Sequence, residues 1–142
     1  MGDLVSSAGI LSIGSATSGL TLNSNSFDGY SVTIQGANGG LKNGIYLIST
    51  SAAGATTTCD ISGNGTDAYG VQATSTTFSI QSPFNLTGNV VGSVASTSQK
   101  LLSSTYSTSS QVATLTVKAS ANKYDASGSY SDTLTLTAVA TP

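Results

Sequence analysis

Hydrophobic and polar residues alternate along much of this chain, and a period of two residues is typical of β-strands that bury one face. The alternation is clearest over residues 29–36, 111–119 and 129–140. Antiparallel sheets with one buried face are built from such segments. The residues that we expect to face inward are Tyr30, Val32, Ile34, Ala113, Leu115, Val117, Ala119, Tyr130, Leu134, Leu136, Ala138 and Ala140.

Weaker alternation predicts further strands at residues 8–13, 19–23, 45–50, 56–61, 68–74, 77–81 and 88–96. Gly and Asn residues separate the strands and mark turns. About ten short strands and no helical periodicity indicate a single all-β domain. We expect an immunoglobulin-like antiparallel β-sandwich with an N-terminal strand extension. In this interpretation residues 1–18 are the extension and residues 19–142 are the sandwich domain.

The N-terminal segment is the part of the sequence that says most about function. Residues 14–19 are rich in Gly and Ser and resemble a flexible linker. Before them, a strand of ten residues would reach about 33 Å, enough to cross a neighbouring sandwich. Residues 4–13 either form the first strand of their own sheet or are donated to the sheet of another subunit. The face that would enter the neighbour carries Val5, Gly9, Leu11 and Ile13.

Strand donation requires an acceptor in the neighbouring copy. We expect the inward residues of the strongest strands to form it, because a donated apolar face needs an apolar surface to cover. A head-to-tail contact of this kind does not close on itself and therefore builds a filament. It also covers exposed sheet edges. The predicted acceptor residues are Tyr30, Val32, Ile34, Leu115, Val117, Leu134 and Leu136.

The composition excludes most chemistry. Only 7% of the residues are charged; all four bases are Lys, all six acids are Asp, and His, Arg, Glu and Trp are absent. Without His there is no Ser-His-Asp or Cys-His catalytic arrangement, and one Cys cannot form a zinc site. Scattered Lys residues in a chain of net charge −2 cannot neutralise nucleic-acid phosphates. We therefore expect that the protein is not an enzyme and that it binds no cofactor, metal or nucleic acid.

Two acidic features and the single cysteine each have both a chemical and a structural interpretation. The run from Asp60 to Asp67 resembles the start of a calcium loop, but Val71 stands where the closing acid is needed, so a turn is favoured. Asp125 and Asp132 resemble a glycosidase pair, yet loop capping by Asp125 is favoured. Cys59 is expected to be a small buried hydrophobic residue, with an intermolecular disulfide as the alternative.

Surface features point outside the cell. Asn64 and Asn85 stand in acceptor sequons for glycosylation at predicted turns. No stretch reaches the roughly 20 apolar residues of a membrane span. The first residues also lack the basic start and long apolar run of a signal peptide. Tyr106, in a polar run, is the one aromatic residue that the sequence marks as plainly exposed.

The segment 128–137, with its Gly-Ser-Tyr-Ser-Asp start and alternating Thr and Leu, resembles the closing strand of spore-coat-U-type domains, which occur in secreted pilins of the chaperone–usher class. Segments 28–35 and 67–72 are similar to strands of low-charge β-sandwich surface proteins, including WxL-like ones. The cysteines usual in spore-coat-U domains and the WxL tryptophan motif are absent. The resemblance implies a secreted, immunoglobulin-like surface or pilus subunit of bacterial or archaeal type.

We therefore expect an extracellular structural subunit that polymerises head to tail with itself by donating its N-terminal strand. Two alternatives stay open at this point: a cell-surface adhesin or carbohydrate-binding module, and a viral capsid or decoration subunit. The scarcity of charge agrees with a polymer, because few charged groups would have to be desolvated at each contact. Such contacts should depend little on pH or salt.

Overall fold

The computed structural model describes residues 13–50, 58–62, 67–122 and 124–141. These residues form eleven β-strands and no helix. The strands are β1 (Ile13–Ser24), β2 (Tyr30–Gly36), β3 (Gly40–Asn43), β4 (Tyr46–Ser49), β5 (Thr58–Asp60), β6 (Ala68–Ser75), β7 (Ser79–Ile80), β8 (Val90–Gly92), β9 (Gln99–Ser104), β10 (Thr108–Ser120) and β11 (Leu134–Ala140).

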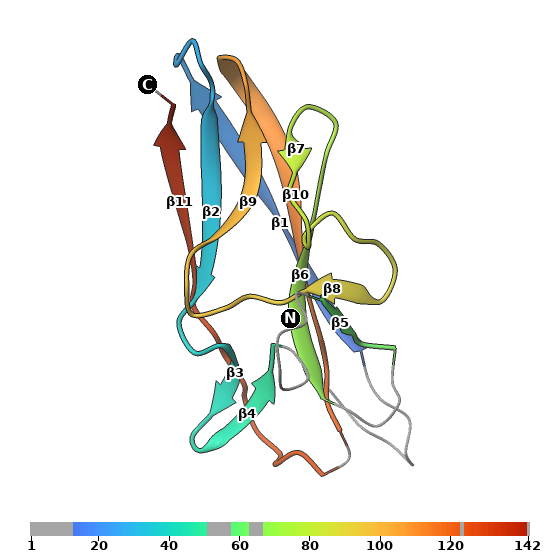
Figure 1. The fold of residues 1–142 in the computed structure, drawn as a ribbon. Coiled ribbons are helices and arrows are strands. Elements are labelled where there is room, and N and C mark those ends of the chain that lie inside the picture. The colour runs from blue at the N-terminus through green and yellow to red at the C-terminus, as the bar shows by residue number, and fades with distance from the viewer. Residues whose placement is uncertain (1–12, 51–57, 63–66, 123, 142) are drawn as a thin grey trace.

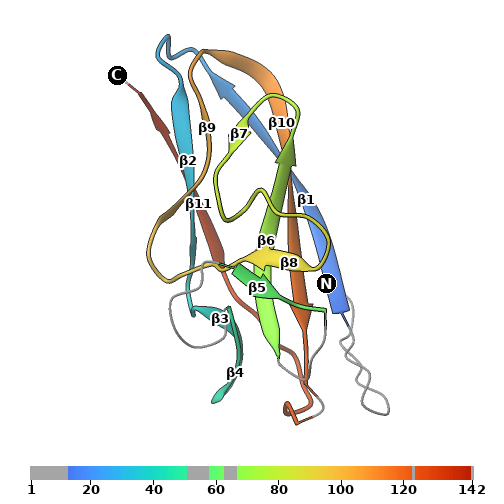
Figure 2. The ribbon, with the colours of Figure 1, turned by 45° about the vertical axis from the view of Figure 1, so that its right-hand side comes forward.

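The strands form two facing sheets and a separate hairpin (Figures 1 and 2). The five-stranded sheet has the order β1-β10-β6-β8-β5, and the four-stranded sheet has the order β11-β2-β9-β7. Strands β3 and β4 pair only with each other and extend from one end. Every pair of neighbouring strands is antiparallel. The expected all-β antiparallel sandwich is thus confirmed.

The main core lies between the two sheets, and the alternation correctly predicted five of its twelve buried residues, those from β2 and β10. Along β2 every second side chain is buried, as predicted. A smaller cluster joins the hairpin to β6 and β10, and Cys59 is buried in a third cluster with Ile61, Ala68 and Val91, as expected for a small hydrophobic residue. The main core cluster consists of Tyr30, Val32, Ile34, Val71, Ala73, Phe78, Phe84, Val94, Leu101, Leu102, Ala113 and Leu115.

Strand β9 was missed by the sequence prediction because it does not alternate. Its register against β2 shifts between Val32, opposite Leu102, and Thr33, opposite Lys100, so that Leu101 is an extra residue. This β-bulge lets the adjacent Leu101 and Leu102 both be buried. Strand β3 was missed as well, because it is only four residues long and begins and ends at residues that the sequence assigns to turns.

The expected linker at residues 14–19 is wrong. These residues form the first half of β1 and pair continuously with residues 114–119 of β10. Backbone hydrogen bonds to a long neighbouring strand outweigh the flexible composition, since the ladder satisfies the N–H and C=O groups of the segment. Residues 1–12 lie outside the described part, so the division of the chain at residue 18 stays a prediction.

Strands β1 and β11 run in the same direction. Beyond β11, the Thr141 N–H donates to the Gly29 carbonyl at 2.9 Å, and its carbonyl accepts from Ser26 Oγ at 2.6 Å. Both partners belong to the loop that follows β1, so β1 and β11 finish together at what we call the upper end (Figure 1). The lower end carries the tip of the β3–β4 hairpin, the loop between β10 and β11, and the start of β1 (Figure 1).

Asp132 ties the start of β11 to the loop after β2. Its Oδ1 accepts hydrogen bonds from the backbone N–H groups of Ala37 and Asn38 at 3.1 Å, and from that of Thr133 at 2.8 Å. Burial raises the pKa of Tyr69, and the neighbouring Asp132 carboxylate raises it further. Asp132 thus fixes a loop and aligns β11 beside β2.

Replacing Asp132 with Ala should lower the free energy of unfolding by about 1–2 kcal/mol, because several backbone donors lose their acceptor. Urea unfolding followed by circular dichroism measures this change. The exposed Asp28, at the upper end, offers a control with the same loss of charge. Asp28→Ala should change stability by less than about 0.5 kcal/mol. Equal effects of the two substitutions would contradict this role of Asp132.

Candidate functional site

The candidate site is the outer edge of β11, which pairs with β2 on one side only. In the register of this pair Leu136 lies opposite Ile34, Ala138 opposite Val32, and Ala140 opposite Tyr30. Paired residues of an antiparallel ladder project to the same face of the sheet. The inward row of β11, defined as Leu134, Leu136, Ala138 and Ala140, therefore faces the same side as the buried residues of β2.

The inward row is nevertheless exposed. Ile34 is fully buried, whereas Leu136 keeps 37% of its surface accessible and Ala138 and Ala140 are also exposed. Leu134 alone is half-buried, at the edge of the core. The alternation predicted for residues 134–140 is correct, but their expected burial is wrong. The alternation predicts which side chains share a face of the strand, but it does not predict whether another part of the protein covers that face.

The physical reason is that the facing sheet does not reach β11. Its edge strand is β1, whose Leu20 and Leu22 pack on the main core cluster, and β1 and β11 make no extended contact. Among the described strands, β2 is therefore the one with which β11 makes extensive contact. The backbone of β11 has the same asymmetry, because a strand at the end of a sheet leaves alternate N–H and C=O groups unpaired.

The predicted acceptor residues do not form one surface. Tyr30, Val32, Ile34 and Leu115 are buried within the main core cluster, and the Tyr30 hydroxyl is hydrogen-bonded to Thr108 Oγ1 at 2.8 Å. Val117 and Leu134 are partly buried against that cluster. Leu136 is the member that is accessible from outside. Ala138 and Ala140 were missed as site residues, although the alternation that placed Leu136 also placed them.

The predicted donor residues Val5, Gly9 and Leu11 lie outside the described residues. Ile13 is the first residue of β1 and pairs with Ser120, the last residue of β10. A donated segment would therefore have to end before Ile13. Strand donation to a neighbouring copy therefore stays a prediction for residues 4–12 and no longer includes Ile13.

The acidic candidates form turns in the described part of the chain. Asp60 Oδ1 accepts a hydrogen bond from the Ser62 N–H at 2.8 Å. Hydrogen bonds from the Ser62 side chain and backbone lower the pKa of Asp60. Val71 is buried in the core, and residues 63–66, including Asn64, lie outside the described residues. Asp125 accepts from the Asn122 N–H and so caps its loop. Asp132 binds a different loop, and no group of three or more acidic or Cys side chains that could hold a metal occurs among the described residues.

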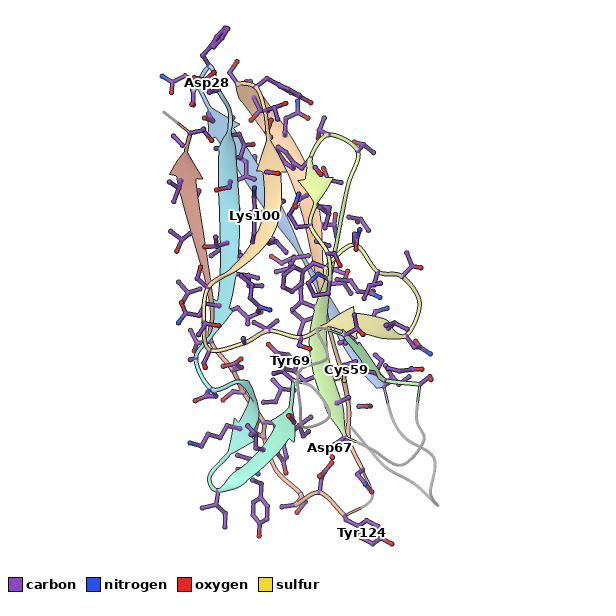
Figure 3. The ribbon with its side chains drawn as sticks, viewed as in Figure 1. Asp28, Cys59, Asp67, Tyr69, Lys100 and Tyr124 are labelled. Carbon is purple, nitrogen blue, oxygen red and sulfur yellow. The ribbon has the colours of Figure 1, made fainter. Side chains whose placement is uncertain are left out.

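Exposed aromatic residues are more numerous than predicted. Tyr106 is exposed as expected, but so are Phe27 in the loop after β1, Tyr46 at the start of β4, and Tyr124, which Figure 3 labels at the lower end. Ile45 and Leu47 of the hairpin are exposed next to Tyr46. Tyr106 was predicted to be exposed because its neighbours in the chain are polar. The same criterion misses Tyr46, which has hydrophobic neighbours in its hairpin.

Carboxylates accompany the aromatic rings of the lower end. Burial raises the pKa of Asp125, and the nearby Asp67 carboxylate raises it further. Burial likewise raises the pKa of Tyr130, with contributions from Asp125, Tyr46 and Asp67. The lower end therefore combines tyrosine rings and two carboxylates within electrostatic range of one another. Asn85 lies in an exposed turn between β7 and β8, where a glycosylation acceptor would be accessible.

The difference in burial between paired residues can be measured. Ile34→Ala should destabilise the domain by about 2–5 kcal/mol, as expected for a fully buried aliphatic residue. Leu136→Ala, directly opposite in the ladder, should cost about 1 kcal/mol or less, because the side chain is already partly in water. Urea unfolding at low protein concentration gives both values. Equal losses would mean that the inward row belongs to the core of the isolated subunit.

Among the described residues, no helix is long and apolar enough to span a membrane. No protein-family model, no curated protein and no solved structure matches this chain. The expected resemblance to spore-coat-U-type pilins thus gains no support from these comparisons. What is established is an all-β chain of antiparallel sheets with an accessible edge at β11.

Proposed function

We propose that this protein is a structural subunit of an extracellular filament, in which residues 4–12 of one copy add as a strand to the β11 edge of the next. The observation that carries the proposal is the exposed inward row of β11, in register with the buried face of β2. A row of core-facing side chains without a cover suits an added strand, which supplies side chains and backbone partners together.

The interactions available at this edge favour assembly. Each backbone hydrogen bond to the open side of β11 contributes about 1 kcal/mol net. Burial of Leu136 and its alanine neighbours adds roughly 25 cal/mol for each Å² of apolar surface. On the face predicted to enter the neighbour, the segment 4–12 supplies Val5 and Leu11 for this purpose.

Composition and surface agree with an extracellular polymer. The outward residues of β11 include Thr135 and Thr137, so an added strand would extend a sheet surface with little charge. Contacts made by short polar and aliphatic side chains respond weakly to salt, since screening acts on charges. The accessible Asn85 sequon fits a secreted protein.

Removal of residues 1–12 should abolish filaments and leave a folded monomer, because β1 and the core are retained. Leu136→Lys should have the same effect on assembly, since a charge in the inward row cannot be buried against a donated strand. Negative-stain electron microscopy and sedimentation velocity measure both outcomes. The same images distinguish fibres from the closed shells that a capsid subunit would form.

Thr135→Lys is the matched control, because it adds the same charge to the same edge strand on the outward face. This variant should assemble like the original chain. Filaments that persist after deletion of residues 1–12, or in the Leu136→Lys variant, would overturn the proposal.

A second candidate function is carbohydrate binding at the lower end. It rests on the exposed rings of Tyr46 and Tyr124 at the lower end, which also carries the Asp67 and Asp125 carboxylates, because sugars stack on aromatic rings and donate hydrogen bonds to carboxylates. A glycan array should then show binding that Tyr124→Ala reduces at least tenfold, whereas Tyr106→Ala, elsewhere on the surface, leaves it unchanged. An array without hits would remove this candidate.

A further inference from the structure

The direction of the strands at the β11 edge decides what kind of assembly is built. We infer that the donated strand runs parallel to β11 of the acceptor and joins copies head to tail in one orientation. This inference rests on the proposed function, because it specifies how the N-terminal segment occupies the edge. Its partner is a second copy of the chain.

The two strands that frame the site have the same direction. β1 starts at the lower end and β11 finishes at the upper end, next to the loop that follows β1. The segment before Ile13 therefore begins its path at the lower end. The entry to the exposed part of the inward row, at Ala138 and Ala140, is at the upper end of the acceptor.

Three routes onto a β11 edge follow from this arrangement. A segment that folds back onto its own β11 would run antiparallel to it. A segment that continues straight into an inverted second copy would also be antiparallel, and the exchange would be mutual and closed. A segment that continues straight into a copy of the same orientation would be parallel to β11, and the series would stay open. Strand polarity thus distinguishes the filament from both closed forms.

The residues next to β1 oppose the fold-back. A tight reversal favours Gly, Pro, Asn, Asp or Ser. Among residues 10–12 only Ser12 is of these types, and it directly precedes Ile13, which already pairs with Ser120. Gly14 cannot serve, because it already pairs with Ala119 within β1. A turn at Gly9 would pair residues 5–8 with residues 10–13 before the chain could reach β11. Straight continuation of β1 is the route that the sequence favours.

The two ends favour the same-orientation stack over the inverted pair. Phe27 is 89% exposed at the upper end, and Ile45 and Tyr124 are 90% and 81% exposed at the lower end (Figure 3). A head-to-tail stack places the lower end of one copy against the upper end of the next and covers both groups. An inverted pair covers the lower ends and leaves Phe27 in water, which forfeits the burial of a large apolar side chain.

The length of the segment fits this route. Twelve residues precede Ile13 in the sequence and reach about 40 Å when extended. Seven residues cover β11, about 24 Å. Of the nine donor residues 4–12, seven are enough to cover β11, and the two nearest Ile13 are available to pass from the lower end of one copy to the upper end of the next. The segment therefore reaches a neighbour's edge without any part of its own β1 being pulled from the sheet.

Disulfide trapping tests the polarity without assuming a register. In a Cys59→Ala background, a cysteine at Ala138 or at Leu134 is combined with one at Val5, Ser7, Gly9 or Leu11. In a parallel pair, the donor position that links to residue 138 comes later in the chain than the one that links to residue 134. The links should produce a ladder of multimers on a non-reducing gel. Thr135→Cys, on the outward face, should form none with the same donors.

An antiparallel strand would reverse the order of the links. Its products would stop at dimers, or would be monomers of shifted mobility, and this result would overturn the inference but leave strand donation in place. Filaments without a link from any donor position to β11 would show that the strand docks elsewhere, and would overturn it too. Absence of any assembly by the original chain would instead remove the proposed function itself. The two failures are therefore distinguishable.

Discussion

The structure depends on the packing of two sheets whose edges do not coincide. The main core cluster joins β2 and β9 of one sheet to β6 and β10 of the other, and it ends at the β2–β11 pair. Because β1 contributes its leucines to this core without extending over β11, one strand is attached by its ladder to β2 and little else. The exposed inward row is a direct consequence.

Local devices hold the strands in the alignment that this packing requires. The bulge at Leu101 allows β9 to bury two consecutive leucines, and Asp132 fixes β11 relative to the loop after β2. The hydrogen bonds of Thr141 join the end of β11 to the loop that follows β1. Together these hydrogen bonds fix both ends of β11 relative to the neighbouring loops.

The β11 edge lacks two kinds of partner. Its side chains need an apolar cover and its backbone needs hydrogen-bond partners, and another strand supplies both. The same chain carries an apolar, alternating segment immediately before β1. Since β1 and β11 run in one direction, a straight continuation of β1 would meet the edge of a neighbour in parallel in the assembly that we propose. The same contact would cover the apolar side chains at the two ends.

The sequence by itself determined the all-β class, the inward face of β2, β10 and β11, the burial of Cys59 and the turn at Asp60, because each depends on a local period or a local hydrogen bond. The tertiary structure alone decided that Gly14–Gly19 is paired, that β9 has a bulge, and that Leu136 is exposed while Ile34 is buried. Pairing, register shifts and burial depend on which strand lies alongside or opposite. A period of two residues specifies the face of a strand, whereas only the assembled sheets specify what covers that face.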